Sequence, residues 1–180
     1  MNVISMVEFR GRQHARLEDS ARKSFIERDF HQALRQVRRC LPFEPRCWQA
    51  HVLHGDILCA LGREGEALVC YHRARRLSPA RAEPYWSVST VHFLACRWEQ
   101  ALRYLDLAQE KLQRGDGPLW EWVAEDRAVA LNHLGRQKEA LAALRWGLRR
   151  RPRGERLLEL RSEMMSASRS PRPVRLRPVP

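Results

Sequence analysis

The side chains best suited to chemistry in this 180-residue chain lie close together in the sequence. His51 and His54 are three positions apart, and Asp56 follows two residues later. Histidines with this spacing share one side of a helix and can hold a metal ion, but no H-E-x-x-H pattern accompanies them. The chain also lacks a glycine-rich phosphate loop and a G-x-S-x-G motif. We therefore expect no catalytic residue, no metal site and no cofactor, with His54 pointing into helix packing.

The five cysteines are an odd number without a C-x-x-C pair, so they do not indicate a disulfide framework. Free thiols are typical of a reducing compartment, and we expect a cytoplasmic protein. Cys40 and Cys70 are predicted to be small core residues, and Cys59 is predicted to be the most exposed cysteine. No run approaches eighteen apolar residues and the first residues do not resemble a secretory signal, so we expect no membrane contact.

The charge of the chain is strongly basic, with a formal net charge of +12. Residues 168–180 are rich in proline and arginine without a core-forming pattern, and we expect them to be a disordered tail. Such a tail could bind nucleic acid through phosphate contacts, or a proline-reading module, but a solvated tail that keeps the protein soluble is favoured over both. The basic residues of this tail are Arg169, Arg172, Arg175 and Arg177.

The predicted helices repeat along the chain. Ala-Leu pairs begin at Ala33, Ala67, Ala101 and Ala140, which are 34, 34 and 39 residues apart. The longer last interval contains the turn-rich residues 114–118. Apolar residues recur at helical spacing, and no strand is indicated. The pattern predicts helices near residues 13–27, 30–42, 48–61, 64–77, 81–95, 98–112, 119–134, 137–150 and 154–167, with Gly62 free to adopt a positive φ at a helix stop.

These repeats resemble the tetratricopeptide repeat (TPR) family, in which small and large residues recur at fixed offsets. The match is best in the second repeat, at Gly55, Ala67, Tyr71, Ala74 and Pro79. The resemblance implies an all-α fold, a right-handed α-solenoid of four antiparallel helix pairs with a C-terminal capping helix. Its expected parts are an N-terminal extension (1–12), four repeats (13–45, 46–79, 80–117 and 118–152), a capping helix (153–167) and the tail (168–180).

The resemblance also implies a concave groove, lined by the first helix of each pair, that holds an extended or helical peptide. The matching offsets give an aromatic and mildly acidic surface, which suits a partner with apolar anchors and some basic residues. The alternative is that its aromatic residues belong partly to the core. The candidate groove residues are Arg22, Phe25, Val52, Asp56, Trp86, Thr90, Phe93, Trp122, Glu125, Val129 and Asn132, with Glu18, Cys59, Glu83 and His133 at equivalent offsets.

The function expected from these features is that of a non-catalytic interaction module or adaptor, as a monomer or weak homodimer. One alternative is a type III secretion chaperone, because residues 83–112 are similar to the third repeat of that group. Another is a nucleic-acid or ribosome-associated factor that acts through the arginine-rich end. A clamp for the C-terminal carboxylate of heat-shock chaperones is disfavoured, since only Arg22 stands at a suitable basic position.

Overall fold

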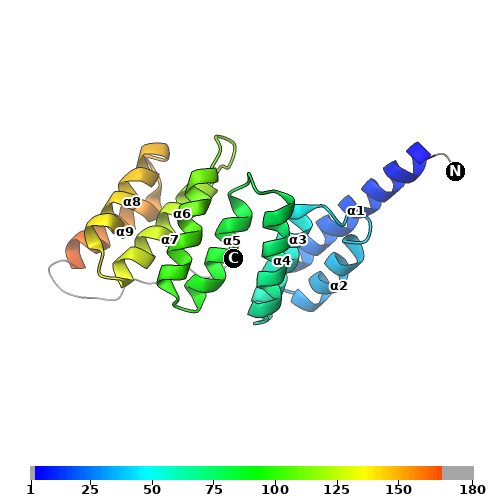
Figure 1. Cartoon of the computed structure of the whole chain (residues 1–180), viewed down its shortest axis with the longest axis horizontal. Coiled ribbons are helices and arrows are strands. Elements are labelled where there is room, and N and C mark those ends of the chain that lie inside the picture. The colour runs from blue at the N-terminus through cyan, green and yellow to red at the C-terminus, as the bar shows by residue number, and fades with distance from the viewer. Residues whose placement is uncertain (1–2, 168–180) are drawn as a thin grey trace. The chain divides into compact units, whose positions relative to one another are not determined.

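The computed structural model describes residues 3–167, and this part of the chain is built from helices joined by short turns, without strands. Helices adjacent in sequence pack as antiparallel pairs, α1 with α2, α3 with α4, α5 with α6, and α7 with α8 (Figure 1). Their bounds are α1 Val3–Ile26, α2 Phe30–Cys40, α3 Trp48–Ala60, α4 Glu64–Leu77, α5 Glu83–Leu94, α6 Trp98–Lys111, α7 Leu119–His133, α8 Gln137–Arg150 and α9 Glu155–Ala167. The all-helical prediction is confirmed.

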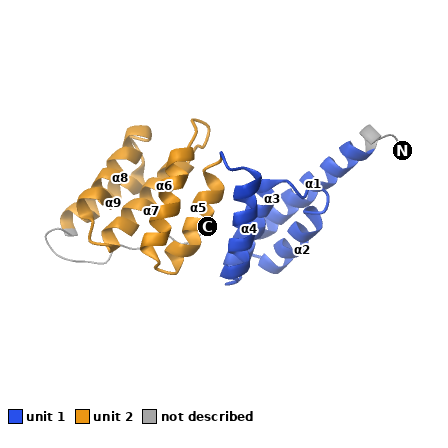
Figure 2. Ribbon diagram, viewed as in Figure 1, with its two compact units in different colours: residues 1–80 blue, residues 81–180 orange. Residues whose placement is uncertain are grey.

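The chain divides into two compact units (Figure 2). Unit 1 comprises residues 1–80 and holds the pairs α1–α2 and α3–α4. Unit 2 comprises residues 81–180, of which the described part holds the pairs α5–α6 and α7–α8 followed by α9. Within unit 2, α9 packs against both helices of the last pair.

Most helix bounds lie within two residues of those predicted, but the first helix is a clear exception. We expected residues 1–12 to be an extension, whereas α1 already begins at Val3. No proline interrupts this stretch, and Glu8 faces Arg12 one turn later, with 4.0 Å between the carboxylate and the guanidinium. Local helix propensity therefore extends α1 toward the N-terminus. This signal is weaker than the repeat pattern from which the start of the helix was predicted.

The turn inside each helix pair has one conformation. The second residue after the helix has a positive φ in every case, at Arg28 (63°), Gly62 (73°), Cys96 (54°) and Gly135 (73°). The next residue donates its backbone N–H to the carbonyl five residues earlier, as Arg63 does to Leu58 at 2.8 Å. This is the Schellman arrangement, which satisfies the last carbonyls of a helix. The prediction for Gly62 is confirmed, and two non-glycine residues adopt the same conformation at equivalent positions.

The small residues of the repeat lie where helices approach each other. Ala33, Ala67, Ala101 and Ala140 are completely buried. In unit 1 the ring of Tyr71 on α4 covers Gly55 on α3, so closely that a Cβ added at Gly55 would lie 2.7 Å from Tyr71 Cδ1. Close packing within the pair is therefore what requires a glycine at this position. Glycine and alanine thus set how near paired helices can come.

Candidate peptide-binding face

Two of the predicted groove residues of unit 1 lie on α1 and already have partners within that unit. Arg22 on α1 is exposed, and its guanidinium binds the Glu18 carboxylate at 2.6 Å. Phe25 is half-buried and packs against Phe30 of α2, with ring centroids 5.6 Å apart. Each of these two side chains therefore already has a partner within its own helix pair.

On α3 the predicted groove residues serve packing as well. Val52 is buried, and Asp56 accepts a hydrogen bond of 2.7 Å from the Tyr71 hydroxyl of α4. The Tyr71 hydroxyl is itself held neutral, because burial raises its pKa well above the usual value. The acid at this position thus orients the aromatic ring that covers Gly55.

The predicted groove residues of unit 2 come together more closely. Trp86 of α5 and Trp122 of α7 are half-buried and stack with ring centroids 5.2 Å apart. The Trp86 indole N–H donates to Asp126 Oδ2 at 2.8 Å, which joins α5 to α7 a second time. The Thr90 hydroxyl turns back to the Trp86 carbonyl oxygen at 3.1 Å. The two half-buried indoles therefore form one surface on neighbouring helices, and the buried Asp126 carboxylate holds Trp86 in it; we call this surface the α5–α7 face.

Other predicted residues of α7 lie deeper than that face. Glu125 is only 3% exposed, and its carboxylate accepts from Arg156 Nε of α9 at 3.1 Å. Val129 is buried, while Asn132 is half-buried. Helix α9 covers this end of α7, which explains why Glu125 can be buried as a paired charge.

The aromatic residues at the far end of α5 belong to a second stack. Phe93 is buried and meets the edge of Trp98 at a centroid distance of 5.2 Å. Trp98 lies flat against His133 at 4.3 Å. These contacts join α5, α6 and α7, so Phe93 contributes mainly to the core of unit 2.

Two residues of this region were not anticipated from the sequence. Asp126 lies one turn after Trp122, so helical spacing could have placed both on one side of α7. Arg156 comes from α9, 31 residues beyond Glu125, and no local pattern connects the two. The pairing depends on where α9 docks.

The two histidines of α3, His51 and His54, contact different partners. His51 Nε2 donates to the Pro45 carbonyl oxygen at 2.9 Å, whereas His54 Nδ1 lies 3.4 Å from Cys70 Sγ on α4. Burial, helped by Arg38, lowers the pKa of His54 to about 4. His51 and His54 therefore have separate partners.

The prediction for Cys59 is wrong: Cys59 is half-buried, with its pKa raised by burial to about 11, and Cys96 is the exposed cysteine.

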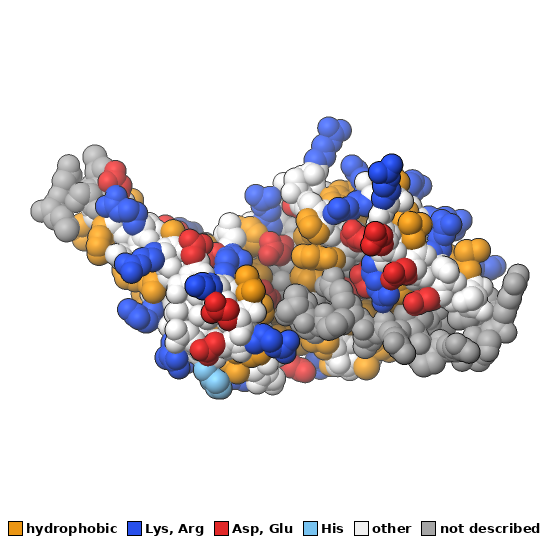
Figure 3. All heavy atoms as spheres, turned by 180° about the vertical axis from the view of Figure 1, so that it is seen from behind, with side chains coloured by type: hydrophobic (Ala, Val, Ile, Leu, Met, Phe, Trp, Pro, Cys, Tyr) orange, Lys and Arg blue, Asp and Glu red, His pale blue; other side chains and the backbone are white. Residues whose placement is uncertain are grey.

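Charge is mixed on the surface. Arg and Lys side chains are spread over the face in Figure 3, and acidic side chains lie among them. Arg127 of α7, for example, pairs with Asp106 of α6 at 2.8 Å. The basic tail residues 168–180 lie outside the described part of the chain. Among the residues described, no helix has the length and apolarity to cross a membrane.

Comparison with known proteins shows the fold. No family model and no curated protein matches the chain. Among solved structures, a thermophilic TPR protein of Thermus thermophilus matches with a TM-score of 0.71 and 20% identity, over 83% of this chain and 80% of that one. PilF of Pseudomonas aeruginosa matches with a TM-score of 0.79 and 16% identity, over 89% and 71%. YrrB, described as a TPR protein with an unusual peptide-binding site, matches with a TM-score of 0.61 and 17% identity, over 86% and 77%. The expected tetratricopeptide-repeat fold is thereby confirmed.

Proposed function

Starting from this tetratricopeptide-repeat fold, we propose that the chain is a non-catalytic interaction module that binds a peptide segment on the α5–α7 face. The observation that carries the proposal is the stacked pair of Trp86 and Trp122. Both indoles are half-buried rather than enclosed, and they lie on the first helices of their pairs. The solved structure of YrrB, with its peptide-binding site, supports a peptide as the class of partner.

The composition of the face indicates the chemistry of that peptide. Stacked indoles offer a large rigid apolar surface, and such residues dominate the affinity of many interfaces. Asp126 accepts from Trp86 and is only 9% exposed, so it places a mostly buried negative charge beside the pair. A peptide with an apolar anchor for the indoles and a lysine or arginine beside it would complement both features. The buried carboxylate would act mainly on the orientation of the Trp86 ring and on the dissociation rate.

The test is to select peptides from a random library on the full chain and to measure the Kd of the best peptide by fluorescence polarisation. Trp86→Ala and Trp122→Ala should each weaken binding about tenfold or more, because each removes half of the apolar anchor site. Asp126→Asn should mainly raise the dissociation rate, because the buried carboxylate fixes the Trp86 ring.

The chain provides a matched control in a second indole pair. Trp120 of α7 stacks on Trp146 of α8 at 5.1 Å, and Arg150 lies over the Trp120 ring. Trp146→Ala removes an indole stack of the same kind from the same unit, but this stack lies between α7 and α8 and not between α5 and α7. If Trp146→Ala weakens binding as much as Trp86→Ala, or if both first-helix variants bind like the wild type, the α5–α7 face is not the binding site.

A further inference from the structure

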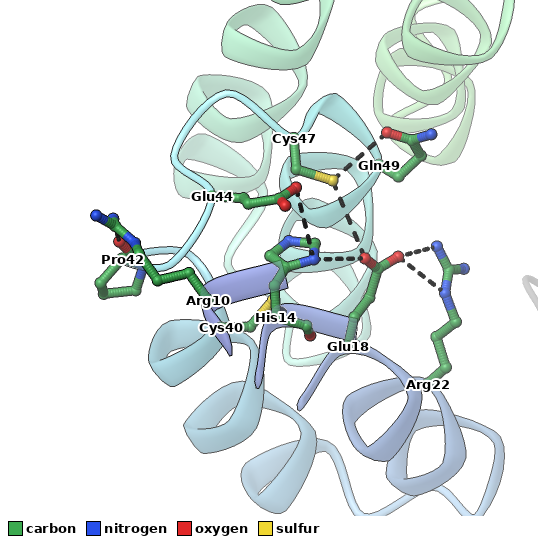
Figure 4. A network of polar contacts seen from close by, with 9 residues as sticks. All are labelled: Arg10, His14, Glu18, Arg22, Cys40, Pro42, Glu44, Cys47 and Gln49. Carbon is green, nitrogen blue, oxygen red and sulfur yellow. Dashed lines mark hydrogen bonds and ion pairs between the residues drawn. The ribbon is translucent and has the colours of Figure 1, made fainter. Parts of the chain in front are cut away.

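A polar cluster in unit 1 gathers side chains from separate stretches of the chain (Figure 4). His14 and Glu18 come from α1, Cys40 from the end of α2, and Glu44 and Cys47 from the loop that leads into α3. Within two groups, the possible ligand atoms all lie within 4.8 Å of one another. One group is His14, Glu18 and Cys40, and the other is His14, Glu44 and Cys47.

The distances in this cluster are too long for direct hydrogen bonds between the histidine and the acids. His14 Nδ1 lies 3.7 Å from Glu18 Oε2 and 3.9 Å from Glu44 Oε2. An N–H···O hydrogen bond spans only about 2.7–3.2 Å. Ligands of a tetrahedral zinc ion, with bonds of about 2.0–2.3 Å, lie roughly 3.3–3.8 Å apart. The observed separations are thus close to those of atoms that share a metal ion.

The electrostatics of His14 favour a cation at the same place. Two carboxylates face its Nδ1, and the residue is only 5% exposed. Its other nitrogen, Nε2, is buried and has no hydrogen-bond partner among the described residues. If the imidazole is neutral with its proton on Nε2, the lone pair of Nδ1 points toward negative oxygens. Only a proton or a metal ion between them removes that repulsion.

Surrounding groups orient this cluster, and one of them also competes for a donor. The Cys47 thiol donates to Gln49 Oε1 at 3.5 Å, a contact that metal binding would replace. The Arg22 guanidinium holds Glu18 Oε1 through two bonds of 2.6 and 3.2 Å, which leaves Oε2 toward His14 and Cys47. Cys47 Sγ lies 4.0 Å from that Oε2. The Cys40 thiol donates to the His14 backbone carbonyl oxygen at 3.6 Å and so supports the helix behind the cluster. Partners that fix the orientation of a ligand are typical of metal sites.

We propose that His14, Glu44 and Cys47 bind one Zn²⁺ ion, with the Glu18 carboxylate beside them. One imidazole, one thiolate and one carboxylate form a mixed N/S/O set, which suits this borderline-soft cation better than Mg²⁺ or Ca²⁺. Glu44 is half exposed at its side chain, whereas His14 and Glu18 lie beneath it. The ion therefore has an entry path from the loop side. No metal site was expected from the sequence, because these donors belong to no motif.

Binding would tie the loop of residues 41–47 to α1. This loop joins the two helix pairs of unit 1, so the ion would brace the stacking of one pair on the next. The effect is independent of the peptide-binding proposal, which concerns unit 2.

The experiment uses the full chain, stripped of metal with a chelator and kept reduced with a phosphine. Calorimetric titration with Zn²⁺ should give one equivalent per chain. Co²⁺ should give the charge-transfer band of a thiolate ligand and the visible bands of tetrahedral coordination. Cys47→Ser should abolish the thiolate band, and His14→Gln and Glu44→Gln should each weaken Zn²⁺ binding about tenfold or more. Glu44 lies at the surface, so its variant tests the site even if His14→Gln fails to fold.

The controls are the other thiol–imidazole pair and the exposed cysteine. Cys70 and His54 lie 3.4 Å apart in the same unit, and neither belongs to a donor group of three in the described residues. Cys70→Ser, His54→Gln and Cys96→Ser should leave affinity and stoichiometry unchanged. The proposal is overturned if the wild type takes up no Zn²⁺, if Cys47→Ser and Glu44→Gln bind it as well as the wild type, or if the control variants lose binding equally.

Discussion

Single residues set the closest approach of the helices, and Gly55 shows this most directly. The Tyr71 ring occupies the space that a side chain at this position would need. Gly55→Ala should therefore lower the free energy of unfolding by about 1–3 kcal/mol, because the ring must move and α3 and α4 must separate. Urea denaturation followed by circular dichroism measures the change.

Gly65, in the first turn of α4, provides the matched control. No atom lies within 4 Å of the Cβ that it lacks, so Gly65→Ala should raise stability by about 0.5–1 kcal/mol through helix propensity alone. If the two substitutions change stability in the same direction, the close contact with Tyr71 is not what requires glycine at position 55.

At the scale of elements, α9 completes the core of unit 2. Leu157, Leu160 and Met164 are completely buried, and a Cβ at Gly147 of α8 would lie 2.8 Å from Leu157 Cδ1. The same Cβ would lie 2.5 Å from Ala124 Cβ of α7, so α7 and the docked α9 together leave no room for a side chain at this position. A helix pair leaves an apolar face uncovered, so a terminal helix that shields it is required.

This role of α9 predicts different effects for neighbouring leucines. Leu160→Ala should lower the free energy of unfolding by about 2–5 kcal/mol, because it leaves a cavity between α9 and the last pair. Leu158 is 40% exposed on the same helix, and Leu158→Ala should change stability by no more than about 0.5 kcal/mol. Thermal unfolding of the full chain compares them, and equal effects would mean that α9 does not dock through its buried side.

At the scale of the whole molecule, a half-buried neutral histidine makes stability depend on pH. Burial lowers the pKa of His54 from 6.5 to about 4 in the folded chain. Between these values the unfolded chain binds more protons, so stability is highest above pH 6.5 and falls as the pH drops toward 4.

Urea denaturation at pH 7 and at pH 5, in the presence of a chelator, should show this loss of stability. His54→Gln should reduce the difference between the two pH values, because it removes the titrating group. His31 is exposed on α2, and His31→Gln serves as the control that should leave the difference unchanged. A difference that persists in full without His54 would assign the pH dependence to other groups.

Local features of the molecule were predictable from the sequence. The 34-residue spacing located the helix pairs, and the buried alanines and the covered Gly55 follow from that spacing. Helices and their stops depend on residues within one or two turns, so a pattern in the sequence contains the information. The conformation of Cys96 was missed, although it is equivalent to Gly62, because its residue type gives no sign of a positive φ.

The repeat pattern is therefore sufficient to identify the helices and to show which of them pair. It does not show which polar and aromatic side chains meet, because that depends on how the helices pack in three dimensions. Trp86 reaches Asp126 across 40 residues, Arg156 pairs with Glu125 across 31, and His14 of α1 faces Glu44 and Cys47 of a later loop. Such contacts depend on the angle and register at which one helix packs on another. Small shifts in either would separate the partners while the repeat pattern stayed the same.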